Sequence, residues 1–302
     1  MKKVLLVLLS VLSLVAQARE NITIIIGFGS ADNYANIGRT LAEEANKIQD
    51  RYNFIFDVKP GAGQVIAYNY VKNTPNVIFQ TGSAFWIRPY LYPKDSYNIH
   101  EMRTIVTECS VPFAVGSVTY SSWDSVPKDK PLTVATSGLG VISHLVALQL
   151  QKKYPQMIVV PYKTIADAVM ASVSGQVDFV VAFIGDMEKF EIEKNGRRMT
   201  ILGVTGTKAV GKYPTLSSNG FSSILDRANS QSSLMVPTSW NDEKAKEIRK
   251  ILLQAETTKP VRDAYEIDRC IPFQIPENKL QSWWEEQNET WGKLTNGVKV
   301  DQ

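Results

Sequence analysis

The chain has 302 residues, enough for one large domain or two of ordinary size. Hydrophobic residues make up 44% and charged residues 21%, which is typical of a globular protein and excludes a disordered chain. The formal net charge of +3 includes Lys2 and Lys3, so the rest of the chain carries about +1. A nucleic-acid-binding surface needs a stronger basic field than this, so we expect no nucleic-acid partner.

The first 18 residues have the pattern of a secretory signal peptide. Lys2 and Lys3 form the basic start, residues 4–15 the apolar centre, and residues 16–18 (Ala-Gln-Ala) a cleavage site. The apolar centre is too short to span a bilayer as a permanent helix, and no Cys follows the cleavage site to carry a lipid anchor. The sequence therefore predicts removal of residues 1–18 and a soluble, periplasmic protein.

The next segment alternates between strand-like and helix-like patterns. Apolar runs predict strands at 22–26, 54–58 and 77–79, and periodic apolar residues predict helices at 34–49 and 65–72. Alternation of this kind favours a parallel α/β sheet.

The same alternation starts again after about residue 120. Further strands are predicted at 132–135, 158–161, 177–183 and 199–205, with helices at 143–153 and 165–174. Two apolar segments, 111–115 and 232–237, are expected to cross between the two units. We therefore predict two lobes, the first made of residues 19–118 and 236–302 and the second of residues 119–235.

The chain is predicted to end in two helices, 242–256 and 277–294. The last helix carries Trp283, Trp284 and Trp291, and Trp284 and Trp291 are seven residues apart on one helix face. We interpret these side chains as packing against the first lobe and not as a ligand cage.

Cys109 and Cys270 are the two cysteines of the chain. An even pair in an exported protein favours a disulfide, but two buried thiols too far apart to meet stay the alternative. His100 and His144 are the two histidines, and no ligand spacing repeats, so we expect no metal site.

His144 lies beside Ser143, and a Ser and a His are the residue types of a nucleophile and its base. Neighbouring residues of a helix point about 100° apart, so they do not face each other as a nucleophile and its base would. The chain also has no G-x-S-x-G turn and no P-loop lysine. We therefore expect that this protein is not an enzyme and binds no cofactor. We assign His144 the structural role of shaping the first turn of its helix.

Small and polar residues gather in the predicted strand-to-helix turns of both units. The glycine-rich turn 27–32 and the turn 59–64 (K-P-G-A-G-Q) each offer backbone N–H groups and a helix N-terminus to an anion. In open α/β sheets this edge is where ligands bind. We therefore predict that a carboxylate lies between the lobes, near the polar residues Ser30, Gln64, Thr81, Ser83, Thr136, Ser137 and Ser143.

Six motifs then occur in a characteristic order: F-G-S-A-D at 28–32, K-P-G-A-G-Q at 59–64, T-S-G-L-G with H-L at 136–145, V-P-Y-K at 160–163, G-Q-V-D at 175–178 and L-G-V-T-G at 202–206. In this order they resemble the extracytoplasmic solute receptors of tripartite tricarboxylate transporters, the TctC or Bug family. The resemblance covers nearly the whole chain after the signal peptide.

The resemblance implies a two-lobed periplasmic-binding-protein fold, type II-like, with two open α/β sheets joined by two crossing strands. One small organic carboxylate would be held between the lobes, and the closed monomer would dock onto a membrane transporter made of a large and a small subunit. To the polar residues above, the family pattern adds as ligand-binding residues Phe28, Gly29, Ala31, Asp32, Ala62, Gly63, Gly138, His144, Ala182 and Phe183. By position alone, Asp32 would cap its helix.

The sequence departs from the family pattern at the expected site. Phe28 stands where the family has the first Gly of a G-G turn, and Asn36 where it has an Arg; the region that faces the ligand reads Ala182 and Phe183. The two aromatic residues favour a less polar or partly aromatic carboxylate. Three alternatives stay open: a sensor subunit that reports the same ligand to a signalling partner, a secreted serine hydrolase using Ser143 and His144, and an adhesion or scaffold module without a small-molecule cleft.

Overall fold

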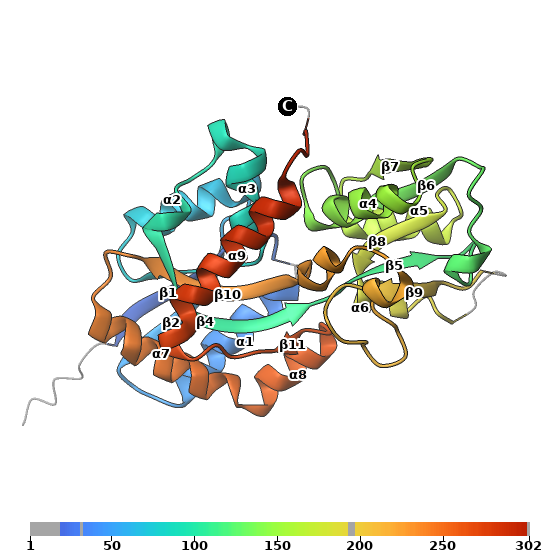
Figure 1. Ribbon diagram of the computed structural model, residues 1–302. Coiled ribbons are helices and arrows are strands. Elements are labelled where there is room, and N and C mark those ends of the chain that lie inside the picture. Colours follow the sequence, from blue (N-terminus) through green and yellow to red (C-terminus); the bar gives the residue numbers. More distant parts are fainter. Residues whose placement is uncertain (1–18, 31–32, 193–196, 301–302) are drawn as a thin grey trace, which may run out of the picture.

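The computed structural model describes residues 19–30, 33–192 and 197–300. The expected signal peptide, residues 1–18, and two expected ligand residues, Ala31 and Asp32, lie outside the described residues. Figure 1 shows two lobes side by side, each built on its own sheet. In the described part of the chain, no helix is both long and apolar enough to cross a membrane.

The described residues of the first lobe form a six-stranded sheet in the order β11-β4-β10-β3-β1-β2. Its strands are β1 (Glu20–Ile26), β2 (Tyr52–Val58), β3 (Val77–Thr81), β4 (Met102–Val111), β10 (Ser230–Pro237) and β11 (Ile271–Pro272). The expected parallel pairing is confirmed for β1 with β2 and β3. Ile24 and Ile25, successive residues of β1 that point to opposite faces, are both fully buried, as expected of a strand covered on both sides.

Helices cover both faces of this sheet. One face packs against α2 (Val65–Asn73), α3 (Ala84–Leu91) and α9 (Leu280–Thr295). The other face packs against α1 (Asn33–Lys47), α7 (Asp242–Glu256) and α8 (Lys259–Ile267). Figure 1 shows α9 running across the first lobe, with α1, α7 and α8 on the opposite side.

The tryptophans of α9 belong to this packing. Trp291 is fully buried, and the rings of Trp283 and Trp86 meet edge to face with their centroids 5.5 Å apart. The expected packing of these side chains against the first lobe is confirmed.

The second lobe is built on five strands of the described chain, in the order β7-β6-β8-β5-β9. The strands are β5 (Phe113–Ser117), β6 (Leu132–Thr136), β7 (Met157–Pro161), β8 (Phe179–Phe183) and β9 (Thr200–Val204), and the helices are α4 (Ile142–Lys153), α5 (Ile165–Val173) and α6 (Ile184–Glu188). β6 is parallel to β7 and β8, whereas β5 is antiparallel to β8 and β9.

The chain crosses from the first sheet to the second between β4 and β5, within the expected segment 111–115. It returns between β9 and β10, so the expectation of a crossing at 232–237 is wrong: these residues lie in β10, paired antiparallel with β3 and β4. A short apolar run has the same pattern in a buried strand and in a crossing segment, which explains the error. The lobe boundaries at 118/119 and 235/236 stay a prediction, although β5 pairs in the second sheet and β10 in the first.

The two crossings are tied together by hydrogen bonds. The N–H of Thr205 donates to the Phe113 carbonyl (2.8 Å), and the N–H of Phe113 donates to Thr205 Oγ1 (2.9 Å). Thr205 Oγ1 in turn donates to Asn229 Oδ1 (2.6 Å). The two connections between the lobes are therefore joined to each other through Phe113, Thr205 and Asn229.

Cys109 and Cys270 form a disulfide, which resolves the alternative of two separate thiols. The bond joins β4 to the segment between α8 and β11 and links residues 161 positions apart. It therefore fixes the C-terminal segment beside the strand that leads into the second lobe.

Candidate functional site

Three turns of the first lobe meet at the carboxyl ends of β1, β2 and β3. Gln64, in the turn after β2, is 1% exposed and fills the space beside Gly27, where an added Cβ would lie 2.7 Å from Gln64 Cγ. Thr81, the last residue of β3, donates from Oγ1 to Gln64 Oε1 (2.7 Å). Gly27 is required here because no larger residue would leave room for the Gln64 side chain.

The turn after β2 has an unusual backbone. Gly61, Ala62, Gly63 and Gln64 all have positive φ, at 127°, 45°, 57° and 75°. Glycine adopts such angles without strain, but Ala62 and Gln64 carry a Cβ and are disfavoured there. Because α2 starts directly after this turn, the helix N-terminus lies at the same edge of the sheet.

A positive charge lies beside the same turn. Arg88 of α3 places its guanidinium against Gly63, where an added Cβ would clash with Nη1. Its Nε and Nη2 donate to the Asp95 carbonyl (3.1 and 2.9 Å), and its guanidinium stacks on the Tyr92 ring at 4.9 Å. This cation was missing from the expected site, because its position depends on how α3 packs and no local motif marks it.

Ser83 lies at the start of α3, close to the return crossing. It is fully buried, donates from Oγ to the Asn229 carbonyl (3.2 Å) and accepts from the N–H of Gln231 (3.0 Å). Its hydroxyl therefore joins α3 to the strand that returns from the second lobe.

In the second lobe, the turn after β6 brings four of the expected residues together. The N–H of Ser137 donates to Ser143 Oγ (3.1 Å), and the two hydroxyls lie 3.0 Å apart. Thr136 donates from Oγ1 to the carbonyl of Gly138, a residue with φ of 124° (3.1 Å).

His144 has the role assigned to it from the sequence. Its Nδ1 accepts from the N–H of Gly140 (3.0 Å), which closes the turn at the start of α4. Burial lowers the pKa of His144, and the Nδ1 acceptor requires the neutral ring. The Ser143 hydroxyl is hydrogen-bonded to Ser137, so Ser143 and His144 are not arranged as a nucleophile and its base.

Two aromatic side chains border the site from opposite lobes. Phe28, after β1, and Phe183, at the end of β8, are both half-buried and pack against the same apolar cluster. The Phe183 ring also lies 4.5 Å from that of Phe113 at the crossing. The other residue expected here, Ala182, is fully buried inside the second lobe. Of these two neighbours, Phe183 is therefore the one that reaches the edge of the sheet.

The lobes contact each other at several points. Arg269 Nε donates to Glu188 Oε2 of α6 (2.7 Å), and the Tyr92 hydroxyl donates to the Leu139 carbonyl (3.3 Å). Arg269 lies directly before the disulfide at Cys270, in left-handed backbone with φ of 50°. These residues were not expected from the sequence, because they pair across segments that are 47 and 81 positions apart.

The carboxyls of Asp268 and Asp186 lie close enough to interact electrostatically near this contact. The pKa of Asp268 is raised above its ordinary value, chiefly by burial and also by the charge of Asp186. The hydrogen bond from the Asn36 amide offsets part of this rise. Asn36 Nδ2 lies 3.4 Å from Asp268 Oδ2, so the side chain that replaces the family Arg bonds within the first lobe.

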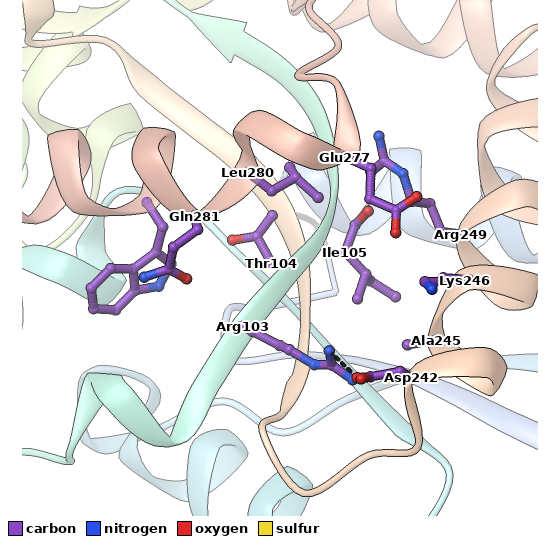
Figure 2. A pocket seen from close by; sticks show the side chains of 11 residues that line it. Arg103, Thr104, Ile105, Asp242, Ala245, Lys246, Arg249, Glu277, Leu280 and Gln281 are labelled. Atoms are coloured by element: carbon purple, nitrogen blue, oxygen red, sulfur yellow. Dashed lines mark hydrogen bonds and ion pairs between the residues drawn. The ribbon is translucent and has the colours of Figure 1, made fainter.

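A pocket of about 310 Å³ lies elsewhere, on the first lobe (Figure 2). It is formed by β4, α7 and the start of α9, and Arg103 and Asp242 make an ion pair of 2.6 Å at its border. Of the described residues that line it, none belongs to the expected ligand site.

Comparison with known proteins supports the fold and gives the family. A TctC solute-binding protein from Polaromonas is 16% identical, covers 93% of this chain and 100% of its own, and superimposes with a TM-score of 0.75. A Rhodopseudomonas palustris protein with bound malate, MatC, is 15% identical, with coverages of 93% and 100% and a TM-score of 0.70. An R. palustris protein solved with adipate is 18% identical, with coverages of 92% and 97% and a TM-score of 0.75.

These structures confirm the two-lobed periplasmic-binding-protein fold. A comparison with curated proteins gives no match. The model of the tripartite tricarboxylate transporter family receptor, TctC, matches residues 37–296. The chain therefore belongs to the TctC family of solute-binding receptors.

Proposed function

We propose that this protein captures a small organic carboxylate between its two lobes and delivers it to a tripartite tricarboxylate-type membrane transporter with a large and a small subunit. The observation that carries the proposal is the meeting of the turns after β1, β2 and β3, with the N-terminus of α2 and the guanidinium of Arg88 beside them. Backbone N–H groups and a nearby cation stabilise an oxyanion without any group that would react with it.

The ligand would lie against turns from both lobes. Its carboxylate would contact residues 28–32 and 62–64, and the second lobe would add residues 136–144 and 182–183. Phe28 and Phe183 would border its carbon skeleton, which favours an acid with an apolar or aromatic body. Two relatives were solved with adipate and with malate, which supports an organic acid as ligand.

Closure of the lobes would be the signal that the transporter reads. A ligand that touches both lobes binds the closed form more tightly and shifts the population towards it. The protein would act without catalysis, as a monomer in the periplasm, after removal of residues 1–18.

The first test is a thermal-shift screen of the protein that starts at Arg19, against aliphatic dicarboxylates, hydroxy acids and aromatic acids, with the corresponding amides as controls. A ligand at a hundredfold excess over its dissociation constant stabilises the folded state by about 2.7 kcal/mol. We expect a shift with one class of acid and none with its amide. If no acid raises the melting temperature, the proposal is wrong.

A second test addresses delivery. Transport of the identified acid into vesicles that contain the large and small membrane subunits should depend on added receptor. Binding without receptor-dependent transport would contradict the transporter role and favour a sensor.

A further inference from the structure

Gln64 has a backbone conformation that its side chain disfavours. Its φ and ψ are 75° and 0°, in the left-handed region. Glycine would adopt these angles without strain, and glycine occupies positions 61 and 63 of the same turn, which also have positive φ. Strained residues of this kind persist where the surrounding structure holds them, and they cluster at binding and active sites.

The Gln64 side chain does not stabilise the helix that follows. Within the described part of the chain, it makes no capping hydrogen bond to α2, although Gln64 is the N-cap residue. Its contacts are with Gly27 and Thr81, which are neighbouring turns of the same edge.

The carboxamide of Gln64 is held in one orientation and is only half satisfied. Thr81 donates to Oε1 (2.7 Å), which directs the N–H bonds of Nε2 away from Thr81. Among the described residues, the buried Nε2 has no hydrogen-bond partner. A buried donor without a partner is unfavourable, because it has lost its hydrogen bonds to water and gained none in return.

Two unfavourable features therefore meet in one residue at the expected carboxylate site, and an acceptor atom supplied by the ligand would relieve one of them. The guanidinium of Arg88 beside Gly63 makes the surroundings suitable for an anionic acceptor. The neutral amide adds two directed N–H bonds, which fit a carboxylate oxygen better than they fit an apolar group.

We propose that Gln64 is a specificity-determining residue of the binding site, and that its Nε2 donates a hydrogen bond to a carboxylate oxygen of the ligand. This inference rests on the proposed function. It assigns to a side chain a contact that a glycine in the same turn could not make.

The test compares three proteins: the wild type, Gln64→Gly and Gln64→Glu. The probes are adipate, malate and benzoate, with binding measured by calorimetry and stability by thermal unfolding without ligand. In Gln64→Gly, relief of the backbone strain and loss of the unpaired donor oppose the cavity left beside Gly27 and the lost hydrogen bond from Thr81, so we expect only a small change in melting temperature. Its affinity for the acid should nevertheless fall about tenfold, as expected for the loss of one hydrogen bond to a charged group.

Gln64→Glu keeps the shape of the side chain but replaces the donor with an acceptor that repels an anion. We expect its affinity to fall further than that of Gln64→Gly. A matched control is Asn76→Gly, because Asn76 also has left-handed backbone (φ 60°) but precedes β3, at the opposite end from Thr81. This variant should bind the acid as the wild type does.

The outcomes separate the two proposals. If the wild type binds an acid and Gln64→Gly binds it within twofold, the inference is wrong while the proposed function stands. Equal affinities of Gln64→Glu and the wild type for the acid would also overturn it, because binding would then not depend on the Nε2 donor. If the wild type binds no carboxylate in the wider screen either, the proposed function fails, and the inference with it.

Discussion

Replacing Glu108 with Gln should remove much of the pH dependence of stability below neutral pH. Glu108 lies in β4 and is fully buried. Gln80 Nε2 donates to both of its carboxyl oxygens (3.0 and 3.1 Å), and Ser232 Oγ donates to one of them (2.5 Å). Burial nevertheless dominates and raises the pKa of Glu108 to about 7, from an ordinary value of 4.5.

The sign of the effect follows from proton uptake. Between pH 4.5 and about 7, the unfolded chain has lost the Glu108 proton while the folded chain still holds it. The stability that this group contributes is complete below pH 4.5 and is lost as the pH rises through about 7. Glu108 alone should therefore lower the free energy of unfolding by about 1.4 kcal/mol per pH unit, or on the order of 3 kcal/mol over this range.

A second buried carboxyl adds to this slope and extends it to higher pH. Burial, together with the charge of Glu108, raises the pKa of Glu256 to about 9. Glu108→Gln removes that charge, so the pH dependence that remains in the variant should also end at a lower pH than in the wild type.

Urea unfolding at pH 5, 6, 7 and 8 measures these slopes. The matched control is Glu266→Gln, which changes an exposed carboxyl of α8 and should follow the wild type. We expect the wild-type free energy of unfolding to fall from pH 5 to 7 and the Glu108→Gln curve to be flatter. Equal slopes for the two proteins in this range would refute the reasoning.

Three further predictions concern packing and the contact between the lobes. Trp291→Ala should lower the free energy of unfolding by about 3–5 kcal/mol in urea, because it empties a fully buried site; a loss below 1 kcal/mol would contradict the packing. Reducing the bond between Cys109 and Cys270 should cost about 2–5 kcal/mol, measured by unfolding with and without reductant, and equal midpoints would contradict this. Arg269→Ala should weaken ligand binding by about fivefold at most, because its pair with Glu188 is partly exposed; a larger loss would mean that Arg269 contacts the ligand.

Local patterns in the sequence determined the elements and the family. The helix expected at 242–256 is observed with the same bounds as α7, because its apolar face recurs at the helical period. The parallel core of β1, β2 and β3 followed from the alternation of strands and helices. The order of six short motifs indicated the TctC family, which the match over residues 37–296 confirms. All these signals lie within short stretches of chain.

The tertiary structure decided the features that depend on distant segments. The pairing of Cys109 with Cys270 stayed open in the sequence, since spacing alone does not bring two thiols together. Glu108 is a polar residue of a strand, and its burial against Gln80 of β3 and Ser232 of β10 depends on segments that are distant in the sequence. The unpaired Nε2 of Gln64 depends on where Gly27 and Thr81 come to lie. Periodicity records which side of an element is buried but not which partner covers it, and the chemistry of the proposed site depends on that partner.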